Sequence, residues 1–419
     1  MFYKKIFSIF FILLVFLSMV WITISKAASI LNKDETQKTY IDYKKLYPLS
    51  NKGYKVSDSL ISKYKKTTLQ IKNKVNLAIE TYYPFKETIK YIYGKYNNIL
   101  NQRILYGPNT IIKMDNDYLT YWKPDRIETA FFSESVNNFN YYLEKLQIPF
   151  AFILNPTKIN KFSNSLPEGL IDYSNDNGDA FLKDLKEKNI KYLDLREYFP
   201  KDENEYLNLF FKTDHHWKPQ GGLFAAQLIA EYITQEFPFF SGQVIDHSSF
   251  YTEIPDIPYL GSQGIRAGLG YTSPEDFYFL KTANTIQLTV EVPNNNKSYT
   301  GLFNTIMFDY NILNNSASIY NNKLYTGYLY DGRPEIILKN VTIPHKSKIL
   351  WLRDSSSLVL LPALSLSFSE IRVIDLRTFD GSIKKLIESY KPDLVLCVYG
   401  VSQLELNGST NKTSLFDFE

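Results

Sequence analysis

The sequence predicts an α/β fold in which a doubly wound parallel sheet carries a β-rich insertion and follows an N-terminal membrane-spanning helix. Short apolar runs alternate with amphipathic helical segments before residue 240 and again after residue 345, and this alternation is typical of a parallel sheet covered by helices. Residues 240–345 between them are rich in Gly, Pro, Asn and Tyr. Their short alternating stretches indicate antiparallel strands.

An uncharged apolar run occupies residues 6–25. Twenty such residues are enough to cross a bilayer as a helix, so residues 1–27 are predicted to be a membrane anchor. Lys4 and Lys5 precede the run and favour a cytoplasmic amino terminus. The string "SKA" that ends at Ala27 resembles a signal-peptide cleavage site, which leaves cleavage open as the alternative. The remaining chain is expected to be extracytoplasmic.

The first part of the α/β domain is predicted over residues 104–239, after a helical stalk or linker over residues 28–103. The stalk prediction rests on a polar stretch followed by apolar residues at helical spacing. Pro219 suits the first turn of a helix, because its missing N–H would be unpaired there. The elements expected in the first part are strands at 149–154 and 191–195 and helices at 179–190 and 221–237.

The β-rich insertion is predicted over residues 240–345, with antiparallel strands at 285–292 and 323–330. The α/β domain resumes over residues 346–405, and residues 406–419 form a polar tail that is expected to fray. The second part is expected to contain strands at 348–353, 371–376 and 393–399 and helices at 357–368 and 381–390.

Composition and charge exclude several function classes. The chain has 47 basic and 44 acidic side chains and no basic block with interleaved aromatics, which argues against a nucleic-acid partner. Cys397 is the single cysteine, so an intrachain disulfide and a cysteine-based metal cluster are both excluded. This cysteine lies in an apolar run and is expected to be a small core residue.

The candidate site residues follow predicted strands, on the sheet edge where open α/β folds bind their ligands. Ser355 and Arg377 follow two of these strands and Tyr399 ends a third. Asp214 and His216 precede the helix at 221–237. A serine needs a base to become a nucleophile, and a histidine oriented by a carboxylate is the usual base. Backbone N–H groups near the serine are candidates for binding an oxyanion.

The pair Asp214 and His216 is expected to face one crevice, because alternate side chains of an extended segment point the same way. His215 would then point elsewhere. Other interpretations remain open: Asp354 and Ser355 as a helix cap, and the Asp-His-His triplet as a metal site, although no HExxH spacing accompanies it.

Simpler interpretations also apply to the remaining polar residues on this edge. Arg377 could pair with Asp375 or Asp380, and Tyr399 could be an aromatic at the edge of the core. Lys158, which follows the strand at 149–154, is interpreted as a solvated loop charge.

The string "KTDHHW" resembles the signature of the bacterial DHHW family, which is similar to the alginate O-acetylation proteins of the SGNH-hydrolase-like superfamily. "FILNPTKINKFSNSLP", "PYLGSQGIRAG" and "ILWLRDSSS" add weaker matches. The resemblance implies an SGNH-like fold with Ser355, His216 and Asp214 as catalytic residues. It also implies that Arg377 and Tyr399 are oxyanion or substrate contacts.

This sequence departs from the superfamily pattern at two points. An arginine, Arg353, stands where a glycine usually precedes the Asp-Ser pair. The expected oxyanion asparagine has no evident counterpart in "VYGVSQ".

The function expected from this resemblance is O-acetylation of a cell-surface polysaccharide, such as an exopolysaccharide of the bacterial cell envelope, by a membrane-anchored extracytoplasmic enzyme. The acetyl group would pass through an acetyl-serine, and a membrane-bound O-acyltransferase would be the partner that supplies it. No metal or organic cofactor is required. The alternatives are a carbohydrate acetyl esterase with the same residues, and an inert glycan-binding or envelope-assembly protein.

Overall fold

The computed structural model describes residues 86–419 apart from 108, 164, 241–244, 316–317, 322, 331, 345 and 405–413. The predicted membrane anchor, most of the predicted stalk and much of the polar tail lie outside the described residues. Within the described part, none of the helices has the length and apolar character needed to cross a membrane. The chain divides into two compact units, Met1–Ile89 and Lys90–Glu419, and the second contains the candidate site.

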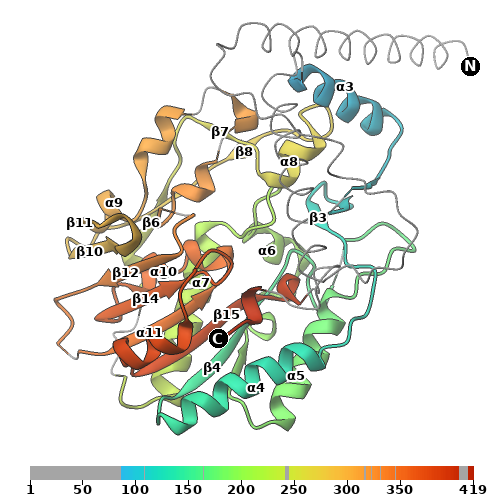
Figure 1. Cartoon of the computed structure of the whole chain (residues 1–419). Coiled ribbons are helices and arrows are strands. Elements are labelled where there is room, and N and C mark those ends of the chain that lie inside the picture. Colours follow the sequence, from blue (N-terminus) through green and yellow to red (C-terminus); the bar gives the residue numbers. More distant parts are fainter. Residues whose placement is uncertain are drawn as a thin grey trace, which may run out of the picture. The chain divides into compact units, whose positions relative to one another are not determined.

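The second unit is built on an eight-stranded sheet with the order β11-β10-β12-β14-β13-β15-β4-β5 (Figure 1). Five neighbouring strands of this sheet run parallel to one another, and they confirm the predicted α/β class. These strands are β4 (Phe150–Asn155), β5 (Tyr192–Asp194), β13 (Lys348–Arg353), β14 (Glu370–Ile374) and β15 (Leu394–Gly400).

The other three strands correct the prediction of an all-parallel sheet, because they pair antiparallel and make the sheet mixed. β10 (Gln287–Val292) pairs with β11 (Lys297–Leu302) and with β12 (Glu335–Lys339), and β12 then pairs with β14. The strands of the predicted β-rich insertion therefore extend the central sheet.

The strand predicted at 323–330 is wrong. Leu324–Gly327 form a short 3-10 helix, η7, and only Tyr328 makes an isolated bridge. Leu329 and Tyr330 follow it with φ of 48° and 56°. Two consecutive residues in the left-handed region cannot continue a strand, so the chain turns there.

Helices cover both faces of the parallel strands, as the doubly wound prediction requires. Along β13, Ile349 and Trp351 belong to a core with α7 (Pro219–Glu236) and α10 (Leu361–Leu364). Leu350 and Leu352 point to the opposite face, because strand side chains alternate. Their core is shared with α4 (Ala130–Lys145), α5 (Ser174–Glu187) and α11 (Ile383–Tyr390).

The helix predicted at 357–368 is confirmed only in part, since the chain forms a 3-10 helix, η8 (Ser355–Leu358), and then the short α10 with Pro362 in its first turn. Cys397 is fully buried in the core, as expected.

The smaller elements complete the unit. The small sheets contain β1 (Ile104–Leu105), β2 (Ile111–Lys113), β3 (Leu119–Tyr121), β6 (Phe250–Glu253), β9 (Phe279–Thr282), β7 (Pro258–Tyr259) and β8 (Glu275–Asp276). The other helices of this unit are α6 (Glu203–Asn208), α8 (Ser262–Ala267) and α9 (Phe303–Ile306). α3 (Lys86–Ile99) begins within the first unit and continues past Lys90.

Candidate active site

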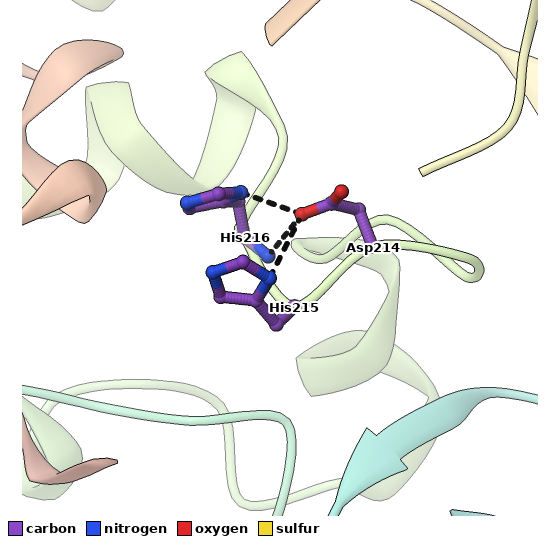
Figure 2. Close-up of side chains that lie close together, drawn as sticks. All are labelled: Asp214, His215 and His216. Carbon is purple, nitrogen blue, oxygen red and sulfur yellow. Dashed lines mark hydrogen bonds and ion pairs between the residues drawn. The ribbon is translucent and has the colours of Figure 1, made fainter. Parts of the chain in front are cut away.

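Asp214 and His216 lie on a bend that leads into α7. The Asp214 Oδ1 atom accepts the backbone N–H of His216 at 3.0 Å and lies 2.5 Å from His216 Nδ1 (Figure 2). A carboxylate that bonds the backbone two residues ahead defines a tight turn. The two side chains therefore meet because the chain turns, and the extended segment expected from the sequence is wrong.

Ser355 completes this group from the carboxyl end of β13. Its Oγ lies 2.8 Å from His216 Nε2. The helix-cap interpretation belongs to its neighbour Asp354, whose side chain accepts the N–H of Ser356 at 2.9 Å and that of Gly400 at 2.7 Å. Asp354 thus fixes the start of η8 on β15, and Ser355 is left facing His216.

Asp214 is buried, and every polar contact around it favours the carboxylate. Its Oδ2 accepts the Tyr259 hydroxyl at 3.1 Å and the Ser262 N–H at 2.6 Å. Burial alone would raise the pKa of Asp214, but the neighbouring imidazoles of His216 and His215 and the hydrogen bonds from His216 and the Ser262 N–H hold that pKa well below its usual value. A Cβ at Gly261 would come within 2.2 Å of the Asp214 Cβ, so only glycine allows this approach.

His215 does not point away from the pair, which corrects the expectation from alternate spacing. Its ring centroid lies 3.8 Å from that of His216, and its Nδ1 lies 2.9 Å from Ser262 Oγ. Burial and the adjacent His216 lower the pKa of His215, although 39% of the side chain is exposed and solvent limits the size of this effect.

A metal ion is the alternative use of the Asp-His-His triplet. One ligand atom from each of Asp214, His215 and His216 lies within 4.8 Å of the others (Figure 2). However, the two nitrogens of His216 face Asp214 and Ser355. With Nδ1–H donating to the carboxylate, Nε2 is left to accept the serine proton, which is the arrangement of a proton relay.

Tyr399 is turned away from the serine, whereas Arg377 is close enough for its charge to contribute, after burial and His216, to the lowered pKa of His215. Arg377 makes a two-pronged pair with Asp375, at 2.9 Å and 2.7 Å, which is one of the simpler alternatives. Tyr399 is fully buried on the α4–α5 face, where its hydroxyl donates to the Leu415 carbonyl at 2.9 Å. Alternation along β15 turns Tyr399 away from the α7 face.

Lys158 is fully enclosed and is not the solvated loop charge expected from the sequence. Its side chain is 2% exposed. Its ammonium donates to the Leu119 carbonyl, to the Lys212 carbonyl at 3.2 Å and to Gln263 Oε1 at 3.0 Å. Burial lowers the pKa of Lys158 to about 7, against the raising effect of the Glu275 and Asp214 carboxylates.

Two aromatic side chains that were not among the predicted site residues contact the reacting groups or the residue next to them. The Tyr325 ring stacks on the His216 imidazole with centroids 3.8 Å apart, and its hydroxyl donates to the Ser355 carbonyl at 3.1 Å. The Trp217 indole donates to the Ser356 carbonyl at 2.8 Å. The chain has 33 tyrosines, so composition gave no signal for Tyr325, whereas Trp217 adjoins the histidines.

A small pocket of about 70 Å³ adjoins Ser355 and His216. This is several times the roughly 10–15 Å³ that a cavity needs to hold one water, so the pocket has room for a small group such as acetyl. Its wall also includes Tyr121, Lys158, Ser402 and Gln403. The geometry therefore provides a carboxylate, a histidine and a serine, each in contact with the next, beside a space for a small acyl group.

Comparison with known proteins supports the resemblance stated from the sequence. Residues 124–269 match the family described as SGNH hydrolase-like domain, acetyltransferase AlgX; this range contains Asp214 and His216 but not Ser355. No curated protein matches the sequence.

Solved structures share the fold. Bacillus cereus PatB1, solved with a sulfonyl adduct, has a TM-score of 0.61 and 23% identity and covers 75% of this chain and 99% of its own. A DHHW family protein from Eubacterium siraeum has a TM-score of 0.54 and 17% identity, with coverage of 72% and 93%. The chain therefore has an α/β fold with an SGNH-like domain, and the predicted resemblance is confirmed.

Proposed function

We propose that this protein is an O-acetyltransferase that acetylates a cell-surface polysaccharide through an acetyl-Ser355 intermediate. The observation that carries the proposal is the continuous chain of contacts from Asp214 through His216 to Ser355. The match of residues 124–269 to an SGNH hydrolase-like acetyltransferase domain supports it. The choice of a polysaccharide as the substrate is based on the resemblance to alginate O-acetylation proteins.

In the first half-reaction, the Ser355 Oγ attacks the carbonyl carbon of an acetyl ester or thioester while His216 Nε2 removes the hydroxyl proton. Asp214 stabilises the imidazolium and holds its orientation. The tetrahedral intermediate collapses, the bond to the donor breaks, and the leaving group takes the proton from His216. The product is acetyl-Ser355.

In the second half-reaction, a sugar hydroxyl attacks the acetyl carbon and His216 Nε2 removes its proton. The bond to the Ser355 Oγ breaks, and His216 returns the proton to that oxygen. The acetyl group is then on the sugar and the enzyme is restored. Water in place of the sugar would make the same residues an esterase, so acceptor binding and exclusion of water decide the outcome.

The place of the reaction is part of the same proposal. We place the domain outside the cytoplasm, anchored through residues 1–27, with a membrane-bound O-acyltransferase as the partner that supplies acetyl groups. The uncharged run at residues 6–25 supports the anchor. The resemblance supports the partner.

The test measures transfer directly. The full-length protein is incubated with p-nitrophenyl acetate, with and without an oligosaccharide acceptor, and acetylated sugar and free acetate are quantified. We expect acetylated sugar with the wild type and none with Ser355→Ala. Free acetate alone, at a rate the acceptor does not change, would indicate the esterase, and equal activity of both proteins would overturn the proposal.

A further inference from the structure

Tyr325 contacts both His216 and Ser355, although its own side chain is not one of the three reacting groups. It lies in η7, within the segment predicted as a β-rich insertion, and is 4% exposed. Its ring stacks on the His216 imidazole with an interplanar angle of 10°. Its hydroxyl donates to the backbone carbonyl of Ser355. One side chain therefore contacts both the base and the residue that carries the nucleophile.

We infer that Tyr325 is a positioning residue for acyl transfer, an inference that rests on the proposed function of Ser355. The stacked ring fixes the plane of the imidazole, so that Nδ1 stays on Asp214 and Nε2 stays on the serine. The hydroxyl fixes the Ser355 carbonyl and thereby the backbone from which the nucleophile projects. Misplacing a reacting group by about 1 Å can cost roughly 100-fold in rate.

The stacking contact also suits the charge that forms during the reaction. His216 becomes an imidazolium when it removes the serine proton, and the face of a tyrosine ring attracts a cation within about 6 Å. The centroid separation of 3.8 Å is well inside that range. An aliphatic side chain of similar bulk would fill the space and exclude water but would lack this attraction.

Tyr328 is a matched control from the same segment. It is also buried, in the same hydrophobic core as Tyr325. Its hydroxyl donates to the Tyr278 carbonyl at 2.6 Å and accepts the Leu280 N–H at 2.9 Å. These contacts are all to the β-rich segment. Its ring centroid also lies 6.2 Å from that of Tyr325, so Tyr328→Phe, which keeps the ring, is the closer control. Substitutions at Tyr328 remove contacts within the β-rich segment and none to His216 or Ser355.

The experiment compares Tyr325→Phe and Tyr325→Leu with Tyr328→Phe and Tyr328→Leu. The acylation rate is the pre-steady-state burst of p-nitrophenol from p-nitrophenyl acetate, measured with the full-length protein well below each Tm. For Tyr325→Leu we expect a loss of about 10- to 100-fold, largely rescued in Tyr325→Phe, which keeps the ring and loses about 3- to 10-fold for the missing hydrogen bond. Both Tyr328 variants should stay within about 2-fold of the wild type.

Equal burst rates for the Tyr325 and Tyr328 variants would overturn the positioning role. If Tyr325→Leu does not fold, the two phenylalanine variants decide, because only Tyr325→Phe removes a contact to Ser355. Ser355→Ala separates this inference from the function beneath it. A burst that persists in Ser355→Ala overturns the proposed function, whereas a burst lost there but unchanged at Tyr325 overturns the positioning role alone.

Discussion

The parallel strands and the segment 245–345 contribute to the candidate site in different ways. The parallel region supplies a reacting atom directly, because Ser355 follows β13 and is anchored through Asp354 to Gly400 at the end of β15. The segment 245–345 contributes none of the three reacting side chains. It supplies contacts that hold them, through Tyr259 on Asp214 and Tyr325 on His216.

Glu275 shows how far this support extends beyond the reacting side chains. Its carboxylate accepts the backbone N–H groups of Lys212 and Thr213, at 2.8 Å and 2.6 Å, and the Thr213 hydroxyl at 2.6 Å. These residues directly precede Asp214. The comparison indicates that the reacting side chains lie at the edge of the parallel strands, while their positions depend on contacts from segment 245–345.

The largest expected effect on the acylation rate comes from substituting Asp214, the carboxylate in the bend that Glu275 supports. Asp214→Asn should keep the shape of the side chain but lower the acylation rate by roughly 10⁴-fold, because an amide cannot hold His216 in the tautomer that accepts the serine proton. The burst of p-nitrophenol measures this rate. An unchanged rate would show that Asp214 has no role in acylation and would favour a site without a proton relay.

The proton relay and a metal centre predict different effects of a chelator on the same burst of p-nitrophenol. Activity that EDTA abolishes and that Zn²⁺ restores would replace the relay by a metal centre at the Asp-His-His triplet. We expect the burst to be unaffected by EDTA.

Glu275→Gln tests whether support from the antiparallel segment reaches the reaction. The new amide would present a donor to one of the two backbone N–H groups, loosen the bend and lower the acylation rate by about 10- to 100-fold. Asp276→Asn is the control, since Asp276 is the exposed neighbour in β8. Equal rates for the two variants would show that the bend keeps its geometry without Glu275.

Lys158 ties the two regions together, and its titration should appear in stability. Its pKa is about 7 in the folded state and about 10.4 when unfolded, so between these values the unfolded state binds more protons and stability rises with pH. The wild type should gain up to about 1.4 kcal/mol per pH unit relative to Lys158→Met from pH 7 to 10. Urea unfolding of both proteins measures this difference, and a constant difference would contradict a buried, titrating amine.

The smallest expected effect on the acylation rate comes from removing a single contact of segment 245–345, the hydrogen bond from Tyr259 to Asp214. Tyr259→Phe removes one of the two donors to Asp214 Oδ2 and leaves the Ser262 N–H in place. The acylation rate should fall by about 3- to 10-fold, the equivalent of one hydrogen bond. A loss as large as that of Asp214→Asn would mean that the segment does more than hold the carboxylate.

The sequence predicted those parts of the fold that local pattern determines. The bounds of β13 match the predicted 348–353 because an apolar run ends there at a polar turn. Ser355 could be placed at the edge of the sheet where parallel strands end, and Asp214 and His216 were expected to face the same crevice because they precede the helix at 221–237. The reason given for the Asp214–His216 pairing was wrong, since a side-chain turn and not an extended chain brings them together.

The contacts that the sequence missed depend on register and on long-range packing. Tyr399 is at the correct strand end, but the register of β15 decides which face it occupies, and a shift of one residue reverses that face. Tyr325 was missed because residues 323–330 were predicted as a strand, whereas Leu324–Gly327 form a 3-10 helix and Leu329 and Tyr330 then adopt a left-handed conformation that is unusual for such residues. Lys158 is buried because three distant acceptors surround its amine.

The most direct test of the central claim is to locate the acyl group on the protein. The full-length protein is quenched during turnover of p-nitrophenyl acetate, digested and analysed by peptide-resolved mass spectrometry. We expect one acetyl group on Ser355, none on the adjacent Ser356, and no labelling of this peptide in Ser355→Ala or His216→Gln. Acetylation of another residue that persists in Ser355→Ala would contradict the account.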